Sequence, residues 1–188
     1  MVRPERDKLS GLVEMDETFM GGVRSGKRGR GAEGMMLGLI AVEDTGKGIG
    51  RIRLSTIPGA TGEAINKATF QMVDRGSTIR SDGWDGYKML TNVGYVHAPI
   101  TPALAASGDA TKLAHHVASL LKRWWLGMHH GAVSPDHLAC YLDEFTFRFN
   151  RRTSRSRGKL IYRLVEQALQ IGPTPGKVLL TAYSGVGA

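Results

Sequence analysis

Residues 12–20 read Leu-Val-Glu-Met-Asp-Glu-Thr-Phe-Met, and Gly21-Gly22 closes the stretch. The stretch is rich in residues that favour strands, so it predicts a β-strand that ends at the glycines. Asp16 lies in the middle of this strand, where a buried carboxylate is costly unless it is paired or bound to a cation. Because side chains alternate along a strand, Glu14 shares the face of Asp16 and Glu17 points the other way.

The next residues predict an antiparallel meander of three strands. Residues 35–42 form a continuous apolar run, which is typical of a strand buried on both faces. Gly46-Lys47-Gly48 predicts a turn, and residues 49–57 alternate as a third strand.

A helix and two short strands are predicted after the meander. Apolar residues recur at helical spacing over residues 64–73, and strands are expected at 77–81 and 95–100. The order of three strands, a helix, two strands and then helices predicts an α/β protein, with a ribonuclease H-like mixed sheet flanked by helices. Several other α/β folds share this order.

The second half of the chain predicts helices. A helix over residues 110–126 carries an apolar stripe formed by Leu113, Val117, Leu120, Leu121 and Trp124. Ser134-Pro135 is a helix-start signal that precedes a second stripe, made by Leu138, Tyr141, Leu142, Phe145 and Phe149. A third, shorter helix is expected at residues 160–168. We therefore predict one catalytic domain over residues 1–170 and a C-terminal tail over 171–188.

The composition favours a polyanionic partner. The formal net charge is +8 and the isoelectric point is near 9.9, and each Lys or Arg placed on a phosphate releases condensed counterions. Basic residues crowd the stretches 24–30 and 148–157. A basic protein without a nucleic-acid partner is the alternative that charge alone leaves open. The single cysteine, Cys140, and the lack of an apolar run long enough to span a bilayer predict a cytoplasmic protein without a membrane partner.

Two aspartates are candidates for a metal site. Asp16 lies within a strand, and Asp82 ends another strand just before Gly83. Acids from separate strands are what a hard cation such as Mg²⁺ requires, because it prefers carboxylate oxygen. The alternative is that Asp16 faces solvent on an edge strand and Asp82 only begins a turn.

A third candidate ligand lies in the helical half. Seven residues on an α-helix complete nearly two turns, so His115 and Lys122 share one face. His116 lies on the flank of that face. His115 and Lys122 also suit an ordinary exposed helix surface, which is the alternative reading.

Several motifs resemble those of DDE transposases from bacterial insertion sequences, specifically the ISXO-like branch, and they follow one another in the same order as in that family. The resemblance covers about residues 9–170. The motifs are Val13 to Gly22, Lys27 to Ala32, Ser81 to Tyr87, Ser119 to Arg123, and Ser134 to Leu138 followed by Tyr141 to Arg152.

The resemblance implies the residues of a metal-dependent site. Asp16 and Asp82 match the first two catalytic carboxylates, and His115 with Lys122 matches a variable third ligand followed seven residues later by lysine. Two divalent ions, Mg²⁺ or Mn²⁺, would be held by Asp16, Asp82 and His115. The segment Thr111-Lys112-Leu113 departs from the usual His-Thr-Asn before the third ligand.

The resemblance also implies DNA strand cleavage and strand transfer by a homo-oligomer assembled on element ends and target DNA, in the bacterial cytoplasm at the nucleoid. Candidate DNA-binding residues are Arg24, Lys27, Arg28, Arg30, Lys122, Arg123, Arg151 and Arg152. Family members usually carry an N-terminal zinc ribbon and helix-turn-helix, which this sequence does not show, so either a truncated gene product or an isolated catalytic domain is expected. Two alternatives stay open: a catalytically inactive DNA-binding remnant, and a cellular ribonuclease H-like nuclease.

Overall fold

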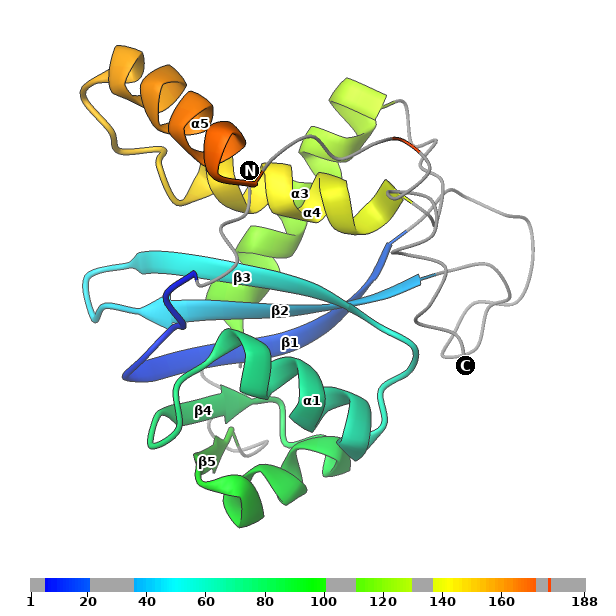
Figure 1. Cartoon of the computed structure of the whole chain (residues 1–188). Coiled ribbons are helices and arrows are strands. Elements are labelled where there is room, and N and C mark those ends of the chain that lie inside the picture. The colour runs from blue at the N-terminus through cyan, green and yellow to red at the C-terminus, as the bar shows by residue number, and fades with distance from the viewer. Residues whose placement is uncertain (1–5, 21–35, 101–110, 130–136, 172–175, 177–188) are drawn as a thin grey trace. The chain divides into compact units, whose positions relative to one another are not determined.

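The computed structural model describes residues 6–20, 36–100, 111–129, 137–171 and 176 (Figure 1). The chain forms two compact units. Lys8–Val133 make one unit, here called the sheet unit, and Met1–Asp7 with Ser134–Ala188 make the other, here called the helical unit.

The sheet unit contains a five-stranded mixed sheet with the order β3-β2-β1-β4-β5. Its strands are β1 (Leu12–Met20), β2 (Met36–Asp44), β3 (Ile49–Ile57), β4 (Thr78–Ser81) and β5 (Val96–Pro99). β1, β2 and β3 pair antiparallel, which confirms the predicted meander, whereas β4 pairs parallel with both β1 and β5. Since β1 is the central strand, the edge-strand alternative for the predicted strand around Asp16 is wrong.

Helices cover both faces of this sheet (Figure 1). α1 (Gly62–Met72) begins at the N-cap Thr61, whose side chain accepts a hydrogen bond from the backbone N–H of Ala64. It packs on the face to which β1 contributes Val13 and Met15. β2 is buried from Leu37 to Val42, as its apolar run predicted. α1 covers one of its faces, and the later helix α3 (Lys112–His129) covers the other.

The sequence analysis did not predict the 3₁₀ helix η1 (Asp85–Val93). It buries Tyr87 and Leu90 in the same core as α1, and it ends at Gly94, whose φ is 93°. Its two buried residues stand three apart, which is the repeat of a 3₁₀ helix. Two apolar residues are too few to reveal such a helix in a sequence.

α3 (Lys112–His129) covers the opposite face of the sheet, but its predicted stripe is rotated. Alongside Val117 and Leu121, the helix buries Ala114, Ala118 and Trp125. The centre of the buried side therefore lies roughly 70° from the predicted stripe. Small alanines let the helix approach the sheet closely, and a search for large apolar residues overlooks them.

The helical unit contains α4 (Leu138–Phe149) and α5 (Arg157–Ile171). α4 begins after the N-cap His137, three residues beyond the predicted cap Ser134. Ser134-Pro135 itself lies outside the described residues. Arg6 forms an ion pair of 3.1 Å with Asp143 within this unit. α5 confirms the predicted third helix, but several of its apolar side chains are exposed, namely Ile161, Tyr162, Leu164, Val165 and Leu169.

In the part of the chain that the structure describes, no helix has the length and apolar character needed to cross a membrane.

Candidate active site

The two candidate aspartates lie at the same level of the sheet. β1 and β4 run parallel, and Glu14 pairs with Arg80 at the end of their ladder. Two further residues along each strand lead to Asp16 and Asp82, with Asp82 directly after the last residue of β4. The ladder ends at the pair of Glu14 and Arg80; because neighbouring strands lie about 4.8 Å apart, the same register continued by two residues would place Asp82 near Asp16.

The titration of neighbouring groups agrees with this placement. Burial raises the pKa of Asp16 above its ordinary value, the His115 imidazole and the N–H of Glu17 lower it, and the Asp82 carboxylate raises it again. Burial also raises the pKa of Tyr87 far above its ordinary value, and the carboxylates of Glu17, Asp16 and Asp82 add to this effect. The Asp82 carboxylate thus adds to the rise of the pKa of both Asp16 and Tyr87.

Asp82 also begins a turn, as one alternative proposed. Its Oδ1 accepts the backbone N–H of Trp84 at 3.0 Å, and Gly83 adopts a φ of 82°. The side chain of Asp82 is exposed. A turn role and a ligand role are compatible, because the turn uses one of the two carboxylate oxygens.

His115 reaches Asp16 from α3. Its Nε2 lies 2.8 Å from Oδ2 of Asp16. The side chain of Asp16 is 15% exposed and that of His115 is 54% exposed. The rotated face of α3 explains this contact. His115 and Lys122 lie beside the buried side of the helix, roughly 100° and 80° from its centre, and they line one pocket with residues 16–19 of β1.

Thr111 is a site residue that the sequence analysis missed. It is 1% exposed, and its Oγ1 lies 3.4 Å from Oδ2 of Asp16 and 3.3 Å from Nε2 of His115. Its backbone oxygen accepts the N–H of His115 at 2.8 Å. The only signal in the sequence is the four-residue spacing from Thr111 to His115, which places both on one side of the first helical turn.

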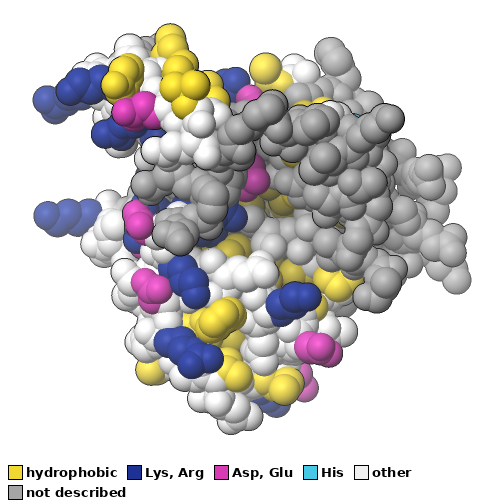
Figure 2. All heavy atoms as spheres, viewed as in Figure 1, with side chains coloured by type: hydrophobic (Ala, Val, Ile, Leu, Met, Phe, Trp, Pro, Cys, Tyr) yellow, Lys and Arg dark blue, Asp and Glu magenta, His cyan; other side chains and the backbone are white. Residues whose placement is uncertain are grey.

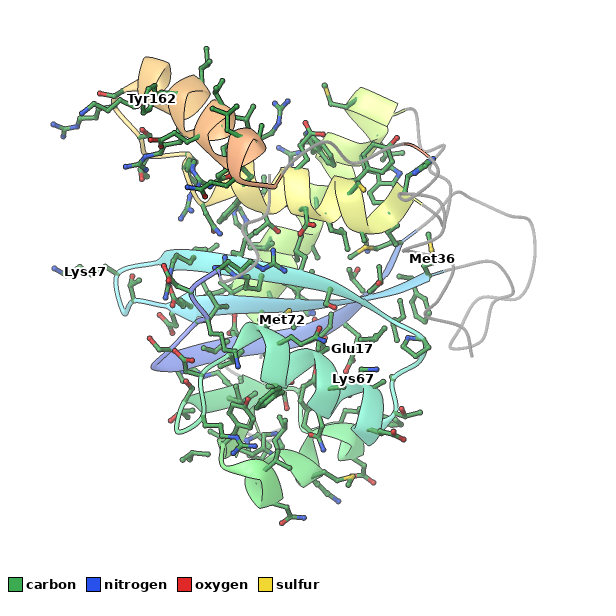
Figure 3. All side chains as sticks on the ribbon, in the orientation of Figure 1. Glu17, Met36, Lys47, Lys67, Met72 and Tyr162 are labelled. Atoms are coloured by element: carbon green, nitrogen blue, oxygen red, sulfur yellow. The ribbon has the colours of Figure 1, made fainter. Side chains whose placement is uncertain are left out.

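A pocket of about 470 Å³ brings together Asp16, His115 and Lys122, whereas Asp82 is not among its lining residues. It is lined by Asp16, Glu17, Thr18, Phe19, His115, Ala118, Ser119 and Lys122. Lys122 is exposed, and His116 is not among the lining residues. Glu17 projects from β1 on the side of α1 and its core residue Met72 (Figure 3). The pocket thus places a carboxylate, an imidazole and a lysine around one space.

The candidate DNA-binding residues divide into three groups. The basic residues of the stretch 24–30 lie outside the described residues. Arg123 is exposed on α3, near Lys122. Arg151 and Arg152 belong to the helical unit and stack on Phe147 and Phe149, at 3.8 and 4.1 Å from the ring centroids.

On the face drawn in Figure 2, the Lys and Arg side chains of the described residues stand apart, with acidic and apolar side chains between them.

The donor set suits a divalent cation in part. Among the described residues no three His, Cys, Asp or Glu side chains are close enough together to form a complete metal site. Asp16 and His115 do meet at 2.8 Å, and Asp82 directly follows the neighbouring strand β4. Mg²⁺ typically takes one or two protein carboxylates and fills its other positions with water and phosphate oxygens. The pair of Asp16 and His115 supplies one carboxylate and one imidazole toward that requirement.

The fold is that of a ribonuclease H-like protein. A similar solved structure is a chain of the simian T-cell lymphotropic virus intasome, determined by cryo-electron microscopy in complex with the PP2A regulatory subunit B56 gamma. The TM-score is 0.54 at 10% sequence identity, and the match covers 82% of this chain and 57% of that chain. This likeness, which concerns the fold alone, confirms the predicted mixed sheet flanked by helices.

Residues 8–150 match the model of the ISXO2-like transposase domain, and the chain belongs to this family. The resemblance predicted from the sequence motifs is therefore confirmed. A comparison with curated proteins found no match.

Proposed function

We propose that this transposase domain cleaves DNA at the ends of an insertion sequence and joins the freed ends to target DNA, with divalent metal ions as cofactors. One observation carries the proposal. His115 lies 2.8 Å from Asp16 on the central strand, with Lys122 lining the same pocket, and Asp82 directly follows β4, which pairs parallel with β1. Membership of the transposase family supports it.

The reaction consists of two phosphoryl transfers at one site. Water attacks the scissile phosphodiester, the bond to the 3′ oxygen breaks, and a 3′-hydroxyl is left at the element end. That hydroxyl then attacks a phosphodiester of the target, whose own 3′ oxygen leaves. When bound, two divalent ions supply positive charge at the entering and leaving oxygens.

The residues of the chain have separate roles in this proposal. Asp16 and Asp82 hold the ions, and His115 completes the ligand set from α3. Asp16 must be ionised to bind a cation, and its burial makes ionisation costly in the absence of one. Thr111 orients the imidazole of His115 and the carboxylate of Asp16. Because imidazole is a poorer ligand for Mg²⁺ than carboxylate, Mn²⁺ is expected to support faster cleavage.

Lys122 and the basic stretches bind the substrate. Lys122 is exposed in the pocket, so its ammonium group meets a phosphate as a point charge. The basic residues of the stretch 24–30 and the arginines Arg123, Arg151 and Arg152 contact the DNA backbone. Assembly of several copies on the DNA belongs to the same proposal.

A cleavage assay tests the proposal. The purified chain is incubated with supercoiled plasmid and with a labelled duplex carrying an element end, in Mg²⁺ or Mn²⁺. Wild type is expected to nick both substrates, whereas Asp16→Asn and Asp82→Asn abolish nicking and retain DNA binding. Asp74→Asn is the matched control, because Asp74 is an exposed aspartate before the start of β4, at the other end of that strand. It is expected to leave cleavage unchanged.

Other outcomes favour the alternatives. DNA binding without nicking in either ion would identify an inactive DNA-binding remnant. Cleavage of RNA–DNA hybrids in preference to duplex DNA would identify a cellular nuclease. Equal loss of activity in Asp74→Asn and Asp82→Asn would show that the site assignment is wrong.

A further inference from the structure

The first turn of α3 is held by a carboxylate from the central strand. Oε2 of Glu14 on β1 accepts the backbone N–H groups of Leu113 at 2.7 Å and of Ala114 at 3.0 Å. The first N–H groups of a helix have no partner within the helix, so Glu14 satisfies two of them. Negative charge at a helix N-terminus is also favoured by the helix dipole.

Burial makes this attachment strong. Glu14 is 1% exposed, so water cannot easily replace its bonds. Arg80 on β4 lies between two acids, with its Nη1 4.0 Å from Oε1 of Glu14 and 3.2 Å from Oδ2 of Asp44 on β2. The charge of Glu14 is therefore partly compensated by a side chain that is itself anchored to the sheet.

The attachment determines which residue of α3 faces Asp16. Glu14 and Asp16 lie on the same face of β1, two residues apart. Glu14 binds the N–H of Ala114, and Asp16 contacts the next residue, His115. A rotation of the helix by one residue would turn it by about 100° and would bring a neighbour of His115 to Asp16. Glu14 and Asp16 on β1 thus contact the consecutive residues Ala114 and His115 in the first turn of α3.

We infer that Glu14 is a positioning residue of the candidate active site: it fixes the rotation of α3 and thereby holds His115 against Asp16. The catalytic consequence rests on the proposed function, whereas the placement of His115 is measurable in the metal-free protein without DNA.

Amide hydrogen exchange followed by NMR tests the attachment. In Glu14→Ala, the amides of Leu113 and Ala114 are expected to exchange at least about tenfold faster, beyond any change at the amides of β2 and β3. Glu14→Gln is expected to show a smaller increase, because its amide oxygen still accepts hydrogen bonds but lacks charge. This variant also carries the test if Glu14→Ala does not fold.

The matched control is Glu43→Gln. Glu43 on β2 is also partly buried and charged, and it binds Arg51 across the β2–β3 pair at 2.6 Å. Its loss weakens the sheet without touching α3, so it is expected to leave the exchange of Leu113 and Ala114 unchanged relative to the strands. If Glu43→Gln accelerated the exchange of Leu113 and Ala114 as much as Glu14→Gln does, Glu14 would contribute only to general stability. That result would overturn the inference.

A second readout tests the effect on His115. At one fixed pH, the ¹⁵N shift of Nε2 of His115 is expected to move in Glu14→Ala toward that of the exposed His116. Unchanged protection of the two amides, or faster exchange with an unchanged His115 signal, would overturn the inference. These results are independent of cleavage, so a wild-type chain without nuclease activity would refute the proposed function and leave the positioning role of Glu14 to be decided by NMR.

Discussion

Replacing Thr111 by valine removes one hydroxyl from the candidate site and nearly preserves the volume of the side chain. The hydroxyl lies 3.4 Å from Oδ2 of Asp16 and 3.3 Å from Nε2 of His115. The backbone bond from the N–H of His115 to the oxygen of Thr111 stays in place. The substitution therefore tests the hydroxyl and leaves the start of α3 as it is.

The expected loss of stability is small. A net hydrogen bond contributes about 0.5–1.5 kcal/mol, and the two contacts of Thr111 are at the long end of hydrogen-bond geometry. Asp16 keeps His115 and the N–H of Glu17 as partners, so no buried acceptor loses all its bonds. We expect the free energy of unfolding to fall by about 0.5–1 kcal/mol. Cleavage is expected to slow about tenfold, as is typical for loss of a group that orients a ligand.

Urea denaturation measures the first effect, and single-turnover cleavage in Mn²⁺ measures the second. Thr111→Ser is the control, since it keeps the hydroxyl and loses only the methyl group, and it is expected to cleave at nearly the wild-type rate. Wild-type cleavage by Thr111→Val would refute the orienting role of the hydroxyl. Equal slowing by Thr111→Ser and Thr111→Val would assign the effect to packing of the methyl group.

Three further predictions concern the same site and its substrate. His115→Ala is expected to abolish metal-dependent cleavage and His116→Ala to leave it nearly unchanged, and the reverse result in a single-turnover assay would overturn the assignment. Burial raises the pKa of Asp16 above the ordinary 3.8, so its ionised form destabilises the folded, metal-free protein. Asp16→Asn should therefore raise the free energy of unfolding at pH 7, and this gain should disappear below pH 3.8; a loss of stability at pH 7 would contradict it. A neutral linker in place of residues 24–30 should weaken DNA binding and flatten its salt dependence, and an unchanged slope in a filter-binding titration would show that this stretch does not touch phosphate.

The strands and helices of the sheet unit were largely predictable because their signals are local. The apolar run of β2 and the alternation of β3 specify strands without knowledge of their neighbours. η1 was missed because it has only two buried residues. The face of α3 was predicted with an error because alanine carries little hydrophobic signal, yet Ala114 and Ala118 form the contact with the sheet.

Part of the candidate site was predictable in its residues, but Thr111 and the connections between the elements were not. Asp16 was recognisable as an acid in an apolar strand, and the seven-residue spacing selected His115. The bonds from Glu14 to the start of α3 join residues 99 and 100 positions apart, and no local pattern records them. The pairing of β1 with β4, the strand that leads to Asp82, likewise depends on how the whole sheet assembles.

The most direct test of the central claim is anomalous diffraction from crystals of the chain soaked in Mn²⁺. We expect manganese within about 2.0–2.3 Å of carboxylate oxygens of both Asp16 and Asp82, with Nε2 of His115 in the coordination shell of one ion. Carboxylates of Asp16 and Asp82 more than about 10 Å apart, beyond any shared pair of ions, or manganese bound by His116 in place of His115, would contradict the account.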